Sequence, residues 1–177
     1  MHLFLDGARG RSDSPGVARV RELAGRLDWP NLTVHMAEHN RGLRQSVLEG
    51  VSELVAAHGS AIVIEDDLLL APAALEYFSA GLDKFADEER VKAVCGYQYK
   101  LQPPAAGNGA FFLPFASSWG WATWRRAWDP FVERLPGLIN LAFDRAFLRR
   151  FDRQGIIAAS TMLKGQQQGL IDSWAIL

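Results

Sequence analysis

Short apolar runs and helically spaced apolar stripes alternate along the first third of the chain. Residues 3–5 are all apolar and run into an Asp-Gly pair, which is typical of a buried strand followed by a turn. Pro15 then opens a segment whose apolar positions recur on one face of a helix, and a Trp-Pro pair stops it. Residues 32–36 predict a second short strand.

The clearest predicted helix covers residues 43–57 and ends at a His-Gly pair. Its inward stripe consists of Leu43, Val47, Val51, Leu54 and Val55. A continuous apolar run over residues 61–64 is typical of a strand buried on both faces. Because strands and helices alternate, we expect an α/β fold with a mostly parallel sheet flanked by helices, in one domain over residues 1–177.

Composition narrows the classes of function. Hydrophobic residues make up 49% and charged residues 22%, which is ordinary for a globular domain and unlike a disordered chain. The net charge of -1 provides no broad basic surface for nucleic acid or an anionic membrane, and we expect no transmembrane segment. Cys95 is the sole cysteine, so no internal disulfide can form, and we expect a reducing, cytoplasmic setting with Cys95 as a buried small hydrophobe.

Three consecutive acids, Glu65, Asp66 and Asp67, directly follow the apolar run at residues 61–64. In parallel sheets, ligands bind beyond the carboxyl ends of the strands. Adjacent carboxylates repel one another, so a divalent cation is their natural partner. The alternative is a solvated acidic turn that caps the helix begun by Pro72.

Tryptophans are concentrated in one segment, where four of the chain's six fall within ten residues. Large amphipathic rings grouped around Gly120 suit the apolar face and the hydroxyls of a sugar. The alternative is a core helix, since Trp121, Trp124 and Trp128 recur at i, i+3 and i+7. We therefore expect at least two of these three in the core, and Trp119 with Gly120 in the site.

Three segments, in this order, resemble N-acetylglucosaminyltransferase I and, more closely, related bacterial sugar transferases. They are Ile-Glu-Asp-Asp-Leu at residues 64–68, Ser-Ser-Trp-Gly-Trp-Ala-Thr-Trp at 117–124 and Asp-Ser-Trp-Ala-Ile at 172–176. The resemblance implies a GT-A-like, Rossmann-like fold of the nucleotide-diphospho-sugar transferases. It also implies metal-dependent transfer of a sugar, with inversion, from a UDP-sugar or similar donor to a glycan or lipid-linked acceptor. Polysaccharide or glycoconjugate synthesis at the inner face of a bacterial membrane is the implied setting.

The resemblance also implies roles for the three acids. Asp67 would be the direct protein ligand of Mn²⁺ or Mg²⁺, with the donor's diphosphate oxygens completing the shell, while Asp66 and Glu65 would contact the ribose and the transferred sugar. Hard carboxylate oxygens suit these cations. The metal would neutralise charge on the departing nucleoside diphosphate.

Asp172 is the predicted catalytic base, which takes the proton of the acceptor hydroxyl as that oxygen attacks the anomeric carbon. This role follows from the resemblance, in which an acid stands shortly before a tryptophan, here Trp174. A helix N-cap is the alternative role, and one residue can fill both.

Asp6 matches an acid that binds the nucleotide base in the resembling enzymes, and a turn-forming Asp is the alternative. Arg41 and Arg44 lie at the predicted start of the helix at 43–57, where helix dipole and donors favour phosphate. Exposed, solvated arginines are the alternative. For His35 and His39 we expect surface or packing roles.

By the same resemblance, the chain lacks the first strand of the family and is truncated at both ends. A noncatalytic sugar-nucleotide or glycan-binding fragment therefore stays as an alternative function. A Mg²⁺-binding, receiver-like signalling domain is a second alternative. In receiver modules, however, the acids follow the first strand, and this alternative leaves the tryptophan cluster unexplained.

Overall fold

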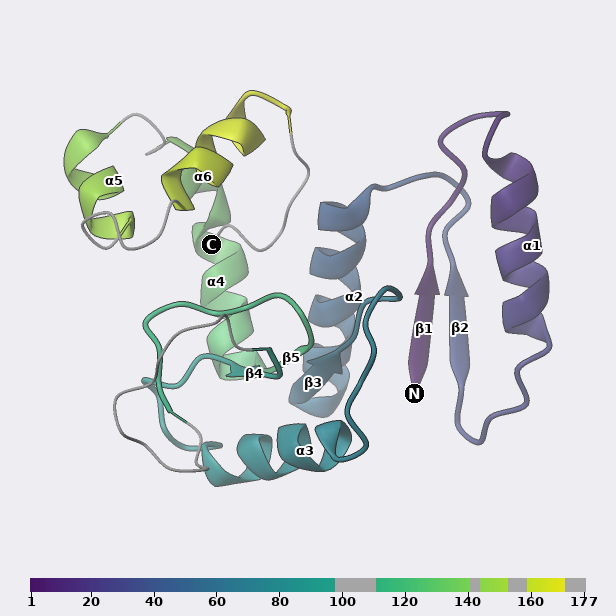
Figure 1. Ribbon diagram of the computed structural model, residues 1–177, viewed down its shortest axis with the longest axis horizontal. Helices are drawn as coiled ribbons and strands as arrows, with labels where there is room; N and C mark the ends of the chain where they lie inside the picture. Colours follow the sequence, from purple (N-terminus) through teal and green to yellow (C-terminus); the bar gives the residue numbers. More distant parts are fainter. Residues whose placement is uncertain (98–110, 141–143, 153–158, 171–177) are drawn as a thin grey trace.

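The computed structural model describes residues 1–97, 111–140, 144–152 and 159–170 (Figure 1). Helices and short strands both occur along the described chain, so the predicted α/β class is confirmed. In chain order the elements are β1 (His2–Leu5), α1 (Ser14–Gly25), β2 (Thr33–Met36), α2 (Leu43–His58), β3 (Ser60–Val63), α3 (Ala74–Lys84), β4 (Val94–Cys95), β5 (Trp121–Trp124), α4 (Arg125–Asn140), α5 (Arg145–Phe151) and α6 (Ala159–Gln167).

The strands form two small sheets instead of one mostly parallel sheet. β1 and β2 pair in parallel, with His2 opposite Thr33 and Leu5 opposite Met36. The second sheet has the order β3-β5-β4, and both of its pairings are antiparallel. Only the first pairing therefore fits the predicted parallel arrangement, because β5 enters the sheet between β3 and β4 in the opposite direction.

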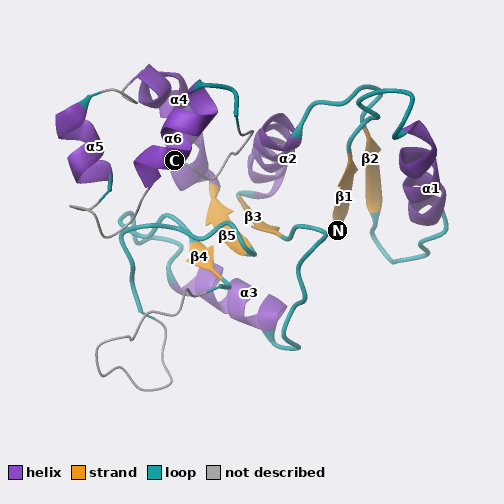
Figure 2. Ribbon diagram, turned by 45° about the horizontal axis from the view of Figure 1, so that its top comes forward, coloured by secondary structure: helices purple, strands orange, loops and turns teal. Residues whose placement is uncertain are grey.

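Helix α2 lies between the two sheets and contacts both (Figures 1 and 2). Its Val51 and Val55 are buried in a core cluster with Ala61 of β3. On another side of the helix, a Cβ added to Gly50 would lie 3.3 Å from the ring of Phe4, so the absence of a side chain lets β1 approach. The helix ends as predicted, at Gly59, whose φ of 81° is a left-handed conformation that favours glycine.

Strand β5 is buried along its whole length, and its two tryptophans enter different cores. Trp121 packs into the cluster shared by α2, β3 and α4, where its ring lies 5.6 Å from that of Trp128. Trp124 packs into the cluster with Phe78 of α3 and Val94 of β4. The expectation that at least two of the three tryptophans are core residues is confirmed. The helical placement is wrong for Trp121 and Trp124, which lie on a strand whose side chains alternate between faces.

Arg126, in the first turn of α4, ties this helix to the end of α3. Its guanidinium donates hydrogen bonds to the carbonyl oxygens of Phe85 at 2.7 Å, Ala86 at 2.7 Å and Val91 at 2.9 Å. The same group lies 4.3 Å above the ring of Trp124. One side chain thus satisfies three carbonyls and covers a core tryptophan.

Strands β1 and β3 each have one neighbour among the described strands, β2 and β5 respectively. Figures 1 and 2 both place β1 and β3 as the facing members of the two sheets. The sequences are HLFL in β1 and SAIV in β3. Two sheet edges therefore face each other beside α2.

A histidine cluster joins the first sheet to α2. Nδ1 of His2 and Nε2 of His35 lie 3.0 Å apart in a hydrogen bond, and the His58 ring centroid lies 5.7 Å from that of His2. Nδ1 of His35 lies 3.8 Å from Oε1 of Glu53, and Phe4 stacks on His35 at 4.3 Å. Burial lowers the pKa of His2, and the nearby His35, N-terminal ammonium and His58 lower it further, against the opposing effect of Glu53.

Because the pKa of His2 is lower in the folded chain, the unfolded chain binds this proton first as the pH falls. This contribution to stability is present above the ordinary histidine pKa of 6.5 and is lost progressively below it. We expect a lower melting temperature at pH 5.5 than at pH 7.5, and a smaller difference in His2→Gln. His39 is exposed and lies outside the cluster, so the control variant His39→Gln should keep the wild-type difference in melting temperature. Identical pH profiles for wild type and His2→Gln would contradict this role.

Candidate functional site

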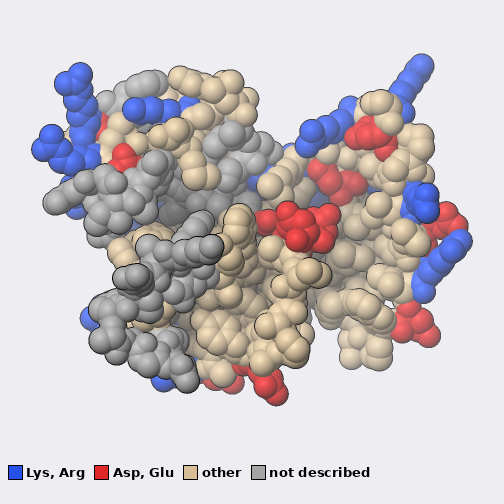
Figure 3. Space-filling model, in the orientation of Figure 1, with Lys and Arg blue, Asp and Glu red and all other residues tan. Residues whose placement is uncertain are grey.

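The three acids form a turn at the end of β3. Asp66 and Asp67 are exposed, Glu65 is half-buried, and the Leu68 N–H donates to the Glu65 carbonyl at 3.3 Å. Figure 3 shows an acidic group near the middle of one face, over the loop that follows β3. Helix α3 begins only at Ala74, without a side-chain cap. The acids therefore form an exposed turn, as one alternative expected, but they do not cap the next helix.

The turn at Gly120 packs against this acidic turn. Gly120 has a φ of 68°, and a Cβ added there would lie 3.8 Å from Ile64 Cδ1 and 3.8 Å from Leu68 Cδ1. Ile64 and Leu68 bracket the three acids in the sequence. Two motifs that are distant along the chain thus meet at one edge of the β3-β5-β4 sheet.

Trp119 stands at the surface beside the buried β5. Its side chain is 47% exposed, and its backbone N–H donates to Ser117 Oγ at 3.3 Å. The Ser117 N–H in turn donates to the Cys95 sulfur at 3.3 Å, and burial raises the pKa of that thiol. Cys95 is half-buried and supports the Trp119 segment.

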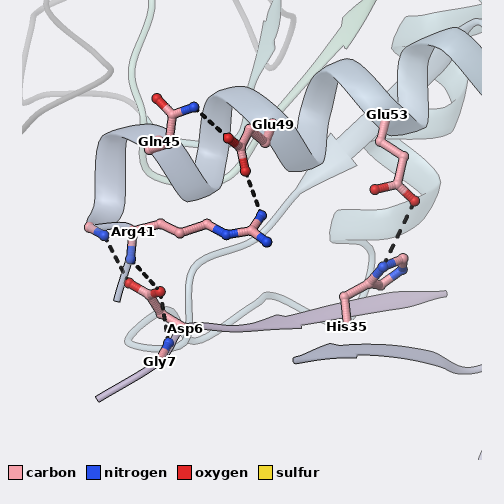
Figure 4. A network of polar contacts seen from close by, with 8 residues as sticks. Asp6, Gly7, His35, Arg41, Gln45, Glu49 and Glu53 are labelled. Carbon is pink, nitrogen blue, oxygen red and sulfur yellow. Dashed lines mark hydrogen bonds and ion pairs between the residues drawn. The ribbon is translucent and has the colours of Figure 1, made fainter. Parts of the chain in front are cut away.

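Asp6 holds the loop before α2 in place (Figure 4). Its Oδ1 accepts from the N–H groups of Gly7 and Arg41, both at 2.8 Å. Its Oδ2 accepts from Asn40 Nδ2 at 2.9 Å and from the Gly42 N–H at 3.0 Å. A carboxylate has about four acceptor positions, and these donors fill them. The geometry supports the turn-forming role of Asp6, and a nucleotide base would have to replace one of the present donors.

The two arginines lie at the start of α2. The Arg41 guanidinium is paired with Glu49 in the second turn of the helix, and Gln45 also donates to Glu49 (Figure 4). The hydrogen bond from Gln45 and the charge of Arg41 lower the pKa of Glu49. Arg44 is half-buried in the first turn. The first turn of α2 carries no acidic residue of its own. The Asp6 carboxylate at the helix start and the pairing of Arg41 with Glu49 offset part of the positive charge of the helix dipole and of the arginines.

The expected surface or packing roles of His35 and His39 agree with their positions. His35 packs against Phe4, whereas His39 is exposed and lines an open pocket with Met36, Glu38 and Arg41. This pocket lies beyond the carboxyl end of β2, next to the start of α2. Ligands of parallel strands bind at such ends.

The structure thus brings the predicted site residues together in two groups: Glu65, Asp66 and Asp67 with Trp119 and Gly120, and Asp6 with Arg41 and Arg44 at α2. Asp172 lies outside the described residues. Within the described part of the chain, no group of three or more His, Cys, Asp or Glu is placed to hold a metal ion. In that same part, every helix is too short or too polar to cross a membrane.

Tyr97 is a residue that the sequence analysis missed. It lies two residues after the end of β4, and its ring centroid lies 4.5 Å from that of Trp119. A single tyrosine after a two-residue strand belongs to no periodic pattern of residues from which its position at the site could be predicted. No family model, curated protein or solved structure matches this chain.

The Asp6 network provides a test of its structural role. In Asp6→Asn, one acceptor oxygen becomes an amide donor that faces backbone N–H groups. We expect a loss of about 1–2 kcal/mol in the free energy of unfolding, measured by urea denaturation, because backbone donors lose their acceptor. Asp66→Asn, on an exposed turn, should change stability by less than about 0.5 kcal/mol. Equal losses of stability in Asp6→Asn and Asp66→Asn would argue against a structural role for the Asp6 hydrogen bonds.

Proposed function

We propose that this chain is the nucleotide-sugar-binding and catalytic core of a metal-dependent glycosyltransferase of the GT-A type. The packing of the Gly120 turn against Ile64 and Leu68 carries the proposal. This contact brings the segment that carries the exposed Asp66 and Asp67 next to the segment that carries the exposed Trp119. Carboxylates can hold a cation or sugar hydroxyls, and an aromatic ring suits the apolar face of a sugar.

The acidic turn has the right chemistry for Mn²⁺ or Mg²⁺. Asp67 would hold the ion through hard carboxylate oxygens, and Asp66 and Glu65 would accept hydrogen bonds from ribose and sugar hydroxyls. One protein ligand is enough when diphosphate oxygens and water complete the shell. When bound, the ion would supply charge neutralisation to the leaving diphosphate.

The start of α2 is the proposed phosphate-binding element. The helix dipole and the side chains of Arg41 and Arg44 would attract a phosphate there. The phosphate would compete with the Asp6 carboxylate, which already accepts from the Arg41 and Gly42 N–H groups. The exposed ion pair between Arg41 and Glu49 contributes little stability, so Arg41 can exchange Glu49 for a phosphate at low cost. Asp6 supports this element by fixing the Asn40–Gly42 loop rather than by reaching the nucleotide itself.

The proposed GT-A architecture accounts for the two separate sheets. One further strand between the facing edges of β1 and β3 would join them in the order β2-β1-x-β3-β5-β4, with α2 across the junction. In such a mixed sheet β5 would be antiparallel to its neighbours, as it is to β3 and β4. The shared contact of α2 with Phe4 and with β3 supports this arrangement.

The two alternative functions differ from the transferase in turnover and in sheet topology. A noncatalytic fragment would bind the same donor without turnover. A receiver-like domain is disfavoured because such modules have a parallel sheet, whereas β3 and β4 both pair antiparallel with β5.

Donor binding is tested by thermal denaturation with UDP and Mn²⁺. At a ligand concentration about 100 times the Kd, folded-state binding adds about 2.7 kcal/mol, which corresponds to a rise of roughly 5–10 °C for a chain of this size. Asp67→Ala should remove the rise, and Asp129→Ala, on the exposed face of α4, should keep it. An equal rise in wild type and Asp67→Ala would rule out the metal assignment.

Turnover separates the transferase from the noncatalytic alternative. We expect hydrolysis or transfer from one member of a panel of nucleotide sugars, assayed by release of the nucleoside diphosphate. Asp172→Asn should lose this release while keeping the thermal shift with UDP and Mn²⁺, because a general base acts on the acceptor and not on donor binding. Unchanged release in Asp172→Asn would remove it as the base.

A further inference from the structure

Two large aromatic side chains lie side by side at the surface, on segments that are not adjacent in the sequence. Tyr97 is 40% exposed and Trp119 is 47% exposed. Their ring centroids are 4.5 Å apart and their planes are tilted by 59°. The two tryptophans that follow on β5, Trp121 and Trp124, are only 4% and 7% exposed. Within a few residues the chain therefore passes from an aromatic ring at the surface to aromatic rings in the core.

The backbone beneath the two rings is tightly fixed. The Gly96 N–H donates to the Gly120 carbonyl at 2.8 Å, which joins the residue before Tyr97 to the residue after Trp119. A Cβ added to Gly96 would lie 2.6 Å from the ring of Phe78, so only glycine fits there. Both rings are therefore mounted on a rigid scaffold.

The surroundings of the pair favour a sugar over an apolar ligand. The Gly120 turn touches Ile64 and Leu68, which flank the three acids. Aromatic faces take up the C–H face of a pyranose, and carboxylates on the adjoining turn would accept its hydroxyls. A purely apolar partner would gain nothing from these carboxylates and would desolvate them at a cost.

We infer that Tyr97 and Trp119 together form an aromatic platform that binds a pyranose ring, and that Tyr97 is a sugar-binding residue of this site. Its place in sugar transfer rests on the proposed function. Binding of the pyranose does not require that function.

The test is a titration with methyl pyranosides of glucose, galactose and N-acetylglucosamine, followed by saturation-transfer difference NMR. We expect Tyr97→Ala and Trp119→Ala each to weaken binding of the preferred pyranoside by at least about fivefold, in line with about 1 kcal/mol for an aromatic contact. Tyr97→Phe keeps the ring and should bind within about twofold of wild type. Trp29→Ala removes another exposed tryptophan, 55% exposed on the segment between α1 and β2, and should not change binding.

Melting temperatures of the four variants check folding, and little change is expected because all three positions are exposed. Wild-type affinity in Tyr97→Ala, or no binding of any pyranoside by the wild type, would overturn the platform. Equal competition by a zwitterionic phosphatidylcholine vesicle would also overturn it in favour of an apolar partner. The UDP and Mn²⁺ shift should persist in Tyr97→Ala. If the wild type lacks that shift while pyranoside binding depends on Tyr97, the transferase proposal fails and the platform stands.

Discussion

The burial of β5 on both faces is the constraint on which the candidate site depends. Trp121 enters the core of α2, β3 and α4, and Trp124 enters the core of α3 and β4. A shift of one residue would exchange the two faces and move both rings into the wrong core. The register of β5 against β3 is therefore strongly fixed, and with it the Gly120 turn and its contact with the acidic turn.

Much of the fold could be predicted where one pattern dominated. The apolar stripe and the glycine that follows it predicted both ends of α2 to within one residue. The apolar run at residues 61–64 predicted β3. β5 could not be assigned, because Trp121, Trp124 and Trp128 fit a helical period as well as a strand followed by a helix. The antiparallel pairing of β5 depends on contacts between distant segments, which local periodicity does not contain.

In the candidate site, too, local patterns could be predicted from the sequence, whereas contacts between distant segments could not. Residue type and position identified the acids, Trp119 and Gly120, because carboxylates after a buried strand and aromatics around a glycine are local signals. Their proximity could not be predicted, since it arises from the side chains of Ile64 and Leu68. For Asp6 the sequence left two roles open. The four donors around its carboxylate, three of them backbone N–H groups, favour the structural one.

The facing edges of β1 and β3 have a consequence for how the protein behaves in concentrated solution. Proteins usually protect such edges with lysine or proline, and neither occurs in HLFL or SAIV. Backbone groups along these edges can accept extended segments from other molecules. A segment that covers this side would therefore protect the protein against intermolecular strand addition, as well as completing the sheet.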